Sequence, residues 1–89
     1  MIKVIKFSAD WCGPCKAIAP KFKEISLKEE FFDIEFSEID IDKNQDLATQ
    51  YKIRSIPTVI ILKDDTIIER IVGNNSEKIE QAIIKIKEN

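Results

Sequence analysis

The spacing of apolar residues changes along the chain, and these changes predict where strands and helices lie. Four short runs are rich in β-branched residues or alternate apolar with polar positions, which is typical of strands: 2–7, 34–41, 58–62 and 66–72. Three stretches have apolar residues at helical intervals: 14 to about 30, 44–51 and a segment that begins near 76. The order β-α-β-α-β-β-α predicts an α/β fold in which helices flank a four-stranded mixed sheet.

The connections between these elements predict the strand directions. A strand–helix–strand unit normally joins parallel strands, so we expect the first three strands to be parallel. Asp64 and Asp65 make a plausible two-residue turn, so the fourth strand should return antiparallel to the third at one edge of the sheet. The run 58–62 is dense in β-branched residues and is expected to be buried on both faces. We expect Ser76 to cap the last helix.

Composition limits both the number of domains and the classes of function. The 89 residues suffice for a single domain over 1–89, and 44% apolar with 34% charged residues is typical of globular proteins. Fourteen basic residues face sixteen acidic ones, a net charge of −2 that argues against nucleic-acid binding. No apolar run is long enough to span a membrane, and the first residues lack the layout of a secretory signal. We therefore expect a cytoplasmic protein with no membrane partner.

The candidate chemistry lies in Cys12-Gly13-Pro14-Cys15, where the first strand ends and the first helix begins. The chain has two Cys and no His, which excludes Ser-His and Cys-His catalysis. A thiolate at Cys12 would be stabilised by the partial positive charge of the helix N-terminus, and Pro14 suits the first helical turn. Cys15 lies one turn further and can reach Cys12. A C-x-x-C pair in a βαβ pattern predicts a redox-active dithiol.

Two other interpretations of the cysteine pair remain open at this point. A purely structural disulfide would close a four-residue loop and contribute only about 2 kcal/mol by the chain-entropy formula. A zinc ion or an iron–sulfur cluster needs about four ligands, so the two cysteines could bind one only in a site shared between two chains. We expect no metal site.

Ala9-Asp10-Trp11-Cys12-Gly13-Pro14-Cys15-Lys16 resembles the active-site signature of thioredoxins. Four further stretches are similar to that family: Ile18-Ala19-Pro20, 39–42, 51–58 and Val72-Gly73. The resemblance extends from about Val4 to the C-terminus, and the combination of W-C-G-P-C with a downstream I-P-T is highly specific. It implies the thioredoxin-like version of the α/β fold.

The resemblance also implies a substrate-binding surface around the dithiol. The residues concerned are Trp11, Gly13, Pro14, Ile56, Pro57 and Gly73. Pro57 is expected to be a cis-proline that holds the Ile56 backbone beside the dithiol, where a substrate strand can bind, and Gly73 should line the same groove. Trp11 should offer an apolar contact surface. The alternatives are an ordinary trans-proline that opens a strand, a glycine that only ends the fourth strand, and a tryptophan packed in the core.

A resemblance to thioredoxin implies a protein-disulfide reductase that serves electron transport in cell redox homeostasis. Cys12 should be the exposed nucleophile and Cys15 the shielded thiol that resolves the mixed disulfide. The family binds no cofactor and receives electrons from NADPH through a thioredoxin reductase, so the expected partners are that reductase and disulfide-containing proteins. We expect a monomer. Two alternatives are a disulfide isomerase or oxidase, which usually has His between its cysteines, and a binding module that does not use the dithiol.

The chain departs from the family pattern in three places, one of which is Ser8, where the family often has a second Trp. The chain resembles a short form that lacks the first strand and helix of full-length thioredoxins, so the second strand should lie at the sheet edge. Lys6 stands where thioredoxins bury an Asp, six residues ahead of the first cysteine, and Glu38 aligns with the Lys that faces that Asp. We expect a buried catalytic pair with its charges exchanged. Alternatively, Lys6 only extends its ammonium group to the end of the sheet.

Overall fold

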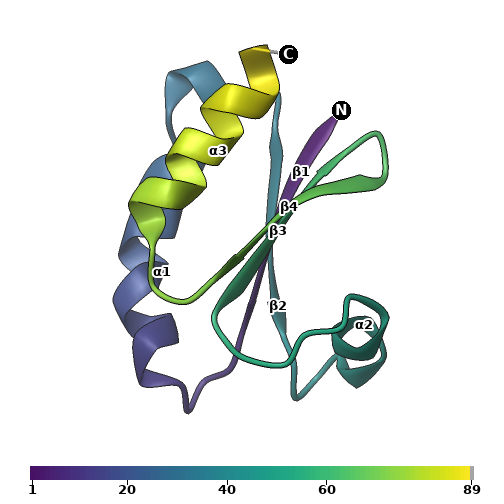
Figure 1. Ribbon diagram of the computed structural model, residues 1–89. Helices are drawn as coiled ribbons and strands as arrows, with labels where there is room; N and C mark the ends of the chain where they lie inside the picture. Colours follow the sequence, from purple (N-terminus) through teal and green to yellow (C-terminus); the bar gives the residue numbers. More distant parts are fainter. Residues whose placement is uncertain (89) are drawn as a thin grey trace.

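The computed structural model describes residues 1–88 and places a four-stranded sheet between two layers of helix (Figure 1). The strands are β1 (Ile2–Ser8), β2 (Glu35–Asp40), β3 (Thr58–Lys63) and β4 (Thr66–Val72). The helices are α1 (Gly13–Ser26), α2 (Gln45–Gln50) and α3 (Ser76–Glu88), with a short 3-10 turn at Glu29–Phe31. This is the element order that the sequence predicts.

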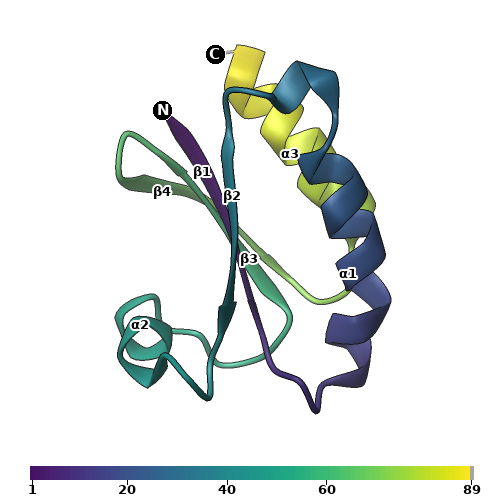
Figure 2. The ribbon, with the colours of Figure 1, turned by 180° about the vertical axis from the view of Figure 1, so that it is seen from behind.

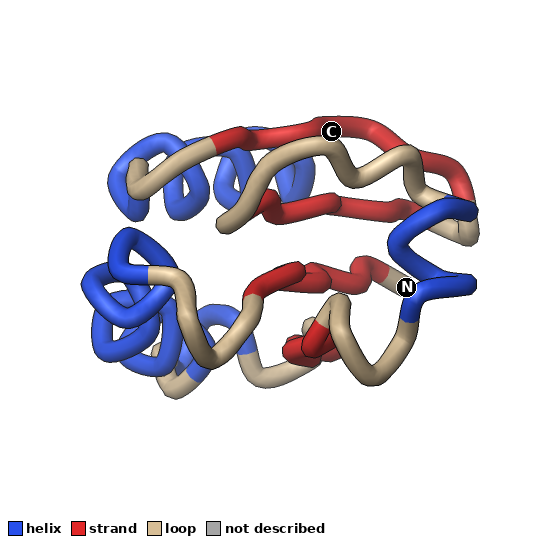
Figure 3. The backbone as a smooth tube through the Cα atoms, turned by 90° about the horizontal axis from the view of Figure 1, so that it is seen from below, coloured by secondary structure: helices blue, strands red, loops and turns tan. Residues whose placement is uncertain are grey.

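Two helices cover one face of the sheet and the third covers part of the other. α1 and α3 lie on the same side and α2 on the opposite side, as the views from behind and from below show (Figures 2 and 3). α1 buries Ile18, Phe22 and Ile25 against the sheet, and α3 buries three isoleucines at positions 79, 83 and 86. Both sets follow helical spacing, which is why these segments fold as amphipathic helices. No helix within residues 1–88 is long and apolar enough to cross a bilayer.

The strand order is β2-β1-β3-β4, which puts β2 and β4 at the two edges. β1 pairs parallel with β2, and β4 pairs antiparallel with β3, as expected. The expectation that β3 is parallel to β1 is wrong, because the two strands are antiparallel. α2 has six residues and spans only about 9 Å, whereas β2 spans about 20 Å. The helix is too short to carry the chain back along the sheet, so β3 starts at the end where β2 stops (Figure 1).

Some of the predicted turns and helix ends are confirmed by the structure, and others are wrong. Asp64 and Asp65 have φ values of 51° and 69°, which is the left-handed backbone of a two-residue hairpin turn. α1 stops at Ser26, earlier than the apolar spacing suggests. The cap expected at Ser76 is instead Asn75, whose Oδ1 accepts the Lys78 N–H at 3.1 Å. β3 is buried on both faces from 58 to 62, as predicted.

Candidate functional site

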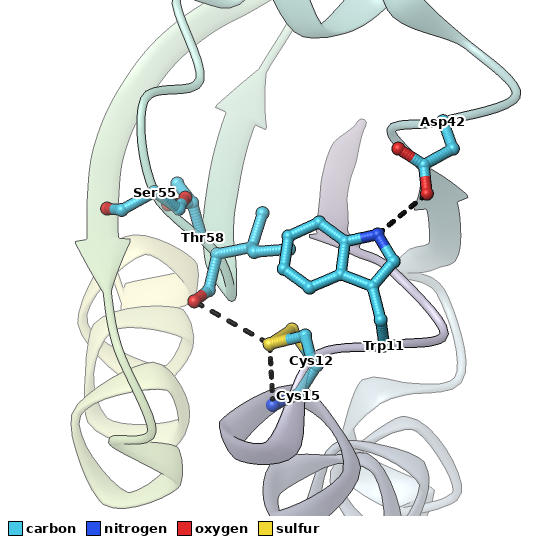
Figure 4. Close-up of a disulfide and its surroundings, with 7 residues drawn as sticks. Trp11, Cys12, Cys15, Asp42, Ser55 and Thr58 are labelled. Atoms are coloured by element: carbon cyan, nitrogen blue, oxygen red, sulfur yellow. Dashed lines mark hydrogen bonds between the residues drawn. A yellow bond between two sulfur atoms is a disulfide. The ribbon is translucent and has the colours of Figure 1, made fainter.

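Cys12 and Cys15 form a disulfide at the N-terminus of α1, where β1 leads into the helix (Figure 4). Cys12 occupies the N-cap position, and its sulfur accepts the Cys15 backbone N–H at 3.2 Å. Its carbonyl accepts the Lys16 N–H, also at 3.2 Å. The sulfur of Cys12 therefore lies against a helix N-terminus, where an N–H group and the helix dipole both favour a negative charge.

Both cysteines are almost buried in this oxidised form. Cys12 is 5% exposed and Cys15 is 4% exposed, so the expectation of an exposed Cys12 beside a shielded Cys15 is wrong for the disulfide. Ala9 belongs to the same small cluster, and Ile41 and Ile56 pack against it. Exposure does not distinguish the two residues in the disulfide, whereas position does, because Cys12 is the N-cap and Cys15 lies inside the first turn.

The segment that precedes β3 lies directly beside the disulfide. The Ile56 carbonyl oxygen is 3.8 Å from Cys12 Sγ, and the Ile56–Pro57 peptide bond is cis. The Pro57 carbonyl accepts the Gly73 N–H at 2.8 Å, which ties the end of β4 to this segment. Gly73 has a φ of +95°, a conformation that residues with a side chain rarely adopt. A Cβ at Gly73 would meet no atom within 4 Å, so backbone conformation rather than crowding explains this glycine.

Trp11 lies on the surface beside the disulfide. Its side chain is 68% exposed, which excludes the alternative of a core residue. The indole Nε1 donates a hydrogen bond of 2.8 Å to Asp42 Oδ2, from the loop after β2 (Figure 4). Gly13 and Pro14 are also exposed, in the first turn of α1. The structure therefore brings all six expected substrate-binding residues around one dithiol.

Lys6 and Glu38 are direct partners across β1 and β2, with Lys6 Nζ 3.0 Å from Glu38 Oε1. Lys6 is 2% exposed, as expected, and its Nζ lies 5.1 Å from the centre of the Phe22 ring. The expectation that Glu38 is buried too is wrong, because its side chain is 58% exposed. The cause is topological: β2 is an edge strand, so the carboxylate reaches solvent while the ammonium stays under α1.

A cavity of about 390 Å³ connects this ion pair to the dithiol. Its lining includes Lys6, Glu38 and Cys15, together with the exposed side chains of Asp10 and Lys16. The space is large enough for several water molecules, and its polar walls can hold them by hydrogen bonds. Lys6 and Cys15 therefore face the same space, through which water could link them.

Sequence reasoning considered Asp42 only as a helix cap and as a charge on the edge strand, and gave it no role in the site, although it lies in one of the stretches that resemble thioredoxins. The hydrogen bond from Trp11 gives it a role, but an exposed contact between residues 31 positions apart has no sequence signal. No group of three or more His, Cys, Asp or Glu side chains within residues 1–88 is arranged to hold a metal ion.

The matching family model, the similar sequences and the similar solved structure described here all belong to one family. The family model described as Thioredoxin matches residues 1–85. Thioredoxin H5 of rice is 45% identical over 78 residues, 88% of this chain and 56% of the rice protein. The chicken thioredoxin is 44% identical over 80 residues, 90% of this chain and 74% of its own length. The solved structure of a Malassezia sympodialis thioredoxin superposes with a TM-score of 0.89 at 36% identity, over 94% of this chain and 73% of that one.

Proposed function

The chain belongs to the thioredoxin family, and from that premise we propose that it is a protein-disulfide reductase. The observation that carries the proposal is the Cys12–Cys15 disulfide at the N-terminus of α1, with the Cys15 N–H on the Cys12 sulfur. Family and dithiol together support thiol–disulfide oxidoreductase chemistry. The chain spans little more than half of the rice relative, so the substrates and partners below are proposals for this chain alone.

In the reduced protein, the Cys12 thiolate attacks one sulfur of a substrate disulfide. The substrate S–S bond breaks, a Cys12–substrate mixed disulfide forms, and the first substrate sulfur leaves as a thiolate that takes up a proton. The backbone N–H that now contacts Cys12 Sγ would also stabilise this thiolate before the attack. Cys12 is thus the nucleophile because it caps the helix.

The second step regenerates the intramolecular disulfide. The Cys15 thiol gives up its proton and attacks Cys12 Sγ, the mixed disulfide breaks, and the second substrate sulfur leaves and is protonated. Two electrons and two protons pass to the substrate in total. We assign Lys6 to this step as a positioning residue, because a buried ammonium near Cys15 favours the thiolate by electrostatic attraction. Glu38 would hold Lys6 in place through the ion pair between them.

The surface around Cys12 would bind the polypeptide that contains the target disulfide. The Ile56 backbone beside the sulfur can pair with an extended substrate segment, while the cis bond at Pro57 and the backbone of Gly73 shape the groove. Trp11 supplies an exposed aromatic surface that Asp42 holds in place. Gly13 and Pro14 complete the rim of the site.

We propose that electrons come from NADPH through a thioredoxin reductase, that no cofactor is bound, and that the protein acts as a cytoplasmic monomer. These assignments rest on the family resemblance, and the absence of His between the cysteines favours a reductase over an oxidase or isomerase. The same reasoning gives an expected reduction potential near −270 mV, the value typical of thioredoxins. A titration against glutathione that gives a value above about −200 mV would instead support an oxidase or isomerase.

The direct test is reduction of insulin disulfides with dithiothreitol as the electron donor. The parent should accelerate insulin reduction, and the Cys12→Ser and Cys15→Ser variants should not do so catalytically. Cys15→Ser should instead accumulate a mixed disulfide with the substrate, which mass spectrometry detects on Cys12. Equal rates with and without the parent protein would overturn the reductase proposal and leave a binding module as the better explanation.

A further inference from the structure

Three of the basic residues converge on one pocket beside the segment that contacts the disulfide. The pocket is about 320 Å³ and is lined by Lys52, Arg54, Ser55, Thr58, Arg70 and Val72. The chain has fourteen basic residues but a net charge of −2, so a local cluster of three cations is a marked departure from its average. Arg54 and Arg70 are the two arginines of the chain, and both lie here.

The pocket lining includes the residues on both sides of the Ile56–Pro57 dipeptide, which lies beside the disulfide. Ser55 and Thr58 stand on either side of the Ile56–Pro57 dipeptide, and Thr58 Oγ1 donates a 2.7 Å hydrogen bond to the Ser55 carbonyl. The Ile56 carbonyl in turn lies 3.8 Å from Cys12 Sγ. Figure 4 labels Ser55 and Thr58 in the segment whose Ile56 carbonyl faces Cys12. An extended segment bound along Ile56 advances about 3.3 Å per residue, so its neighbouring side chains would reach this pocket.

No ion pair within residues 1–88 involves any of the three cations. Glu69, the acidic neighbour of Arg70 in sequence, accepts the Arg70 backbone N–H rather than the guanidinium. The pocket is therefore open to an external anion.

The arginine on β4 is held in position rather than free. Arg70 Nη2 donates a 2.8 Å hydrogen bond to the Tyr51 carbonyl at the end of α2, which joins the edge strand to the loop that carries the other two cations. A guanidinium has five N–H donors, so most of the N–H groups of Arg70 remain available for a ligand. A carboxylate can accept two of these donors at once, with good geometry.

We propose that this pocket selects protein substrates with an acidic side chain close to the target cysteine. The proposal rests on the disulfide reductase function and adds a specificity determinant to it. The occupant is an Asp or Glu side chain one to three residues from the cysteine that Cys12 attacks. Arg54, Arg70 and Lys52 bind its carboxylate while the peptide backbone lies along Ile56.

The test uses reduced protein and short peptides whose single cysteine is linked to 2-thiopyridone, a neutral leaving group that absorbs when released. One set has Glu at each position from one to three residues away, and the matched set has Gln there. We expect the second-order rate constant to be about fivefold higher for the best Glu peptide than for its Gln counterpart, and this preference to weaken with added salt.

Two double variants, each of which removes two positive charges, test whether the preference for Glu arises from this pocket. Arg54→Gln/Arg70→Gln should lower the preference to about one, through a lower rate with the Glu peptide. Lys78→Gln/Lys85→Gln, on α3, should keep the parent's preference. Arg54→Gln alone retains the Arg70–Tyr51 bond and should lose part of the preference, which guards against a folding defect in the double variant.

The possible failures can be told apart. A parent that reacts with the Gln peptides but shows no preference for Glu overturns the pocket assignment and leaves the reductase function intact. The same holds if the preference survives in Arg54→Gln/Arg70→Gln or disappears in the control. Failure to react with any peptide, and with insulin, overturns both the reductase function and the specificity that rests on it.

Discussion

Lys6 Nζ lies 3.0 Å from Glu38 Oε1, yet the lysine is 2% exposed and the glutamate 58% exposed. The pair spans the boundary between the core under α1 and the solvent at the β2 edge. A buried ammonium loses its hydration, and a single half-exposed carboxylate with one aromatic ring compensates for part of that loss. Lys6 therefore costs stability at a position where an apolar residue would fit, which favours a functional reason for its presence.

Replacing Lys6 by Met tests that reason. The side chains are similar in length, so the core volume is kept, and Glu38 can be fully hydrated because it is already largely exposed. We expect the free energy of unfolding to be unchanged or higher by about 1 kcal/mol. We expect resolution of the mixed disulfide to slow about tenfold near pH 7, equivalent to about 1.4 kcal/mol in the barrier. Stopped-flow release of the second substrate thiol from pH 6 to 9 measures this step.

The pH profile distinguishes a role in the chemistry from a role in packing. Loss of the ammonium disfavours the Cys15 thiolate, so the rising part of the Lys6→Met profile should move to higher pH. Glu38→Gln is the matched control: it keeps the ammonium and should keep the profile, while it destabilises the fold by about 1 kcal/mol. Identical profiles for Lys6→Met and the parent would show that Lys6 has no part in resolution.

The sequence predicts the elements well because each depends on local spacing. The apolar positions of α1 and α3 repeat at helical intervals, and the Asp64–Asp65 turn needs only two residues. The direction of β3 was predicted wrongly because the strand–helix–strand rule assumes a helix long enough to carry the chain back along the sheet, and α2 is too short. The pairing of Lys6 with Glu38 could be predicted from the family resemblance and the alternation of side chains, but the exposure of Glu38 depends on the edge position of β2.

The residues of the site divide in the same way. Some could be predicted from neighbouring residues in the sequence, and others depend on contacts between distant segments. The cysteine motif and its place at a helix start are local, so they were predictable from four residues. The contacts that shape the surrounding surface join distant segments: Trp11 with Asp42, and Arg70 with Tyr51. Each is made by exposed polar groups that fit many places on a surface, so no spacing rule identifies them.

Trp11→Ala should separate substrate binding from stability. The indole is 68% exposed, so its loss should change the free energy of unfolding by less than about 0.5 kcal/mol. The variant should reduce insulin about tenfold less efficiently, measured as kcat/KM, because the aromatic surface beside Cys12 is gone. Reduction of a small aromatic disulfide should fall much less. An equal loss with both substrates would assign Trp11 to the chemistry of Cys12 instead.

The ion pair between Lys87 and Asp33 predicts a pH dependence of stability at the acid end. The Lys87 side chain donates to Asp33 Oδ1 at 3.1 Å, and this hydrogen bond holds the pKa of Asp33 below its ordinary value of 3.8. A carboxyl group whose pKa is lowered by folding stabilises the protein above its unfolded pKa and loses that contribution as the pH falls through the folded pKa. Urea unfolding at several pH values from 6 to 2 should show a smaller loss of stability for Asp33→Asn than for the parent. Parallel curves would show that the bond is too solvated to matter.

Lys52→Gly should separate the stability of the α2 end from the selection of acidic substrates. Lys52 follows the helix with a φ of 55°, and its N–H and that of Ile53 bond back to the carbonyls of Thr49 and Ala48. Helices that end with this pattern usually have Gly at that position, because a residue with a side chain is strained there. Relief of that strain exceeds the extra chain entropy of Gly, so the variant should be more stable by about 0.5 kcal/mol in urea unfolding.

The same substitution removes one of the three cations of the pocket beside the dithiol. The preference for Glu over Gln peptides should therefore fall about twofold while the protein becomes more stable, a combination that a folding defect cannot produce. Lys43→Gly changes the charge equally in the loop before α2, outside that pocket, and should leave the preference as in the parent. An unchanged preference in Lys52→Gly would remove Lys52 from the binding site and leave the two arginines as its cations.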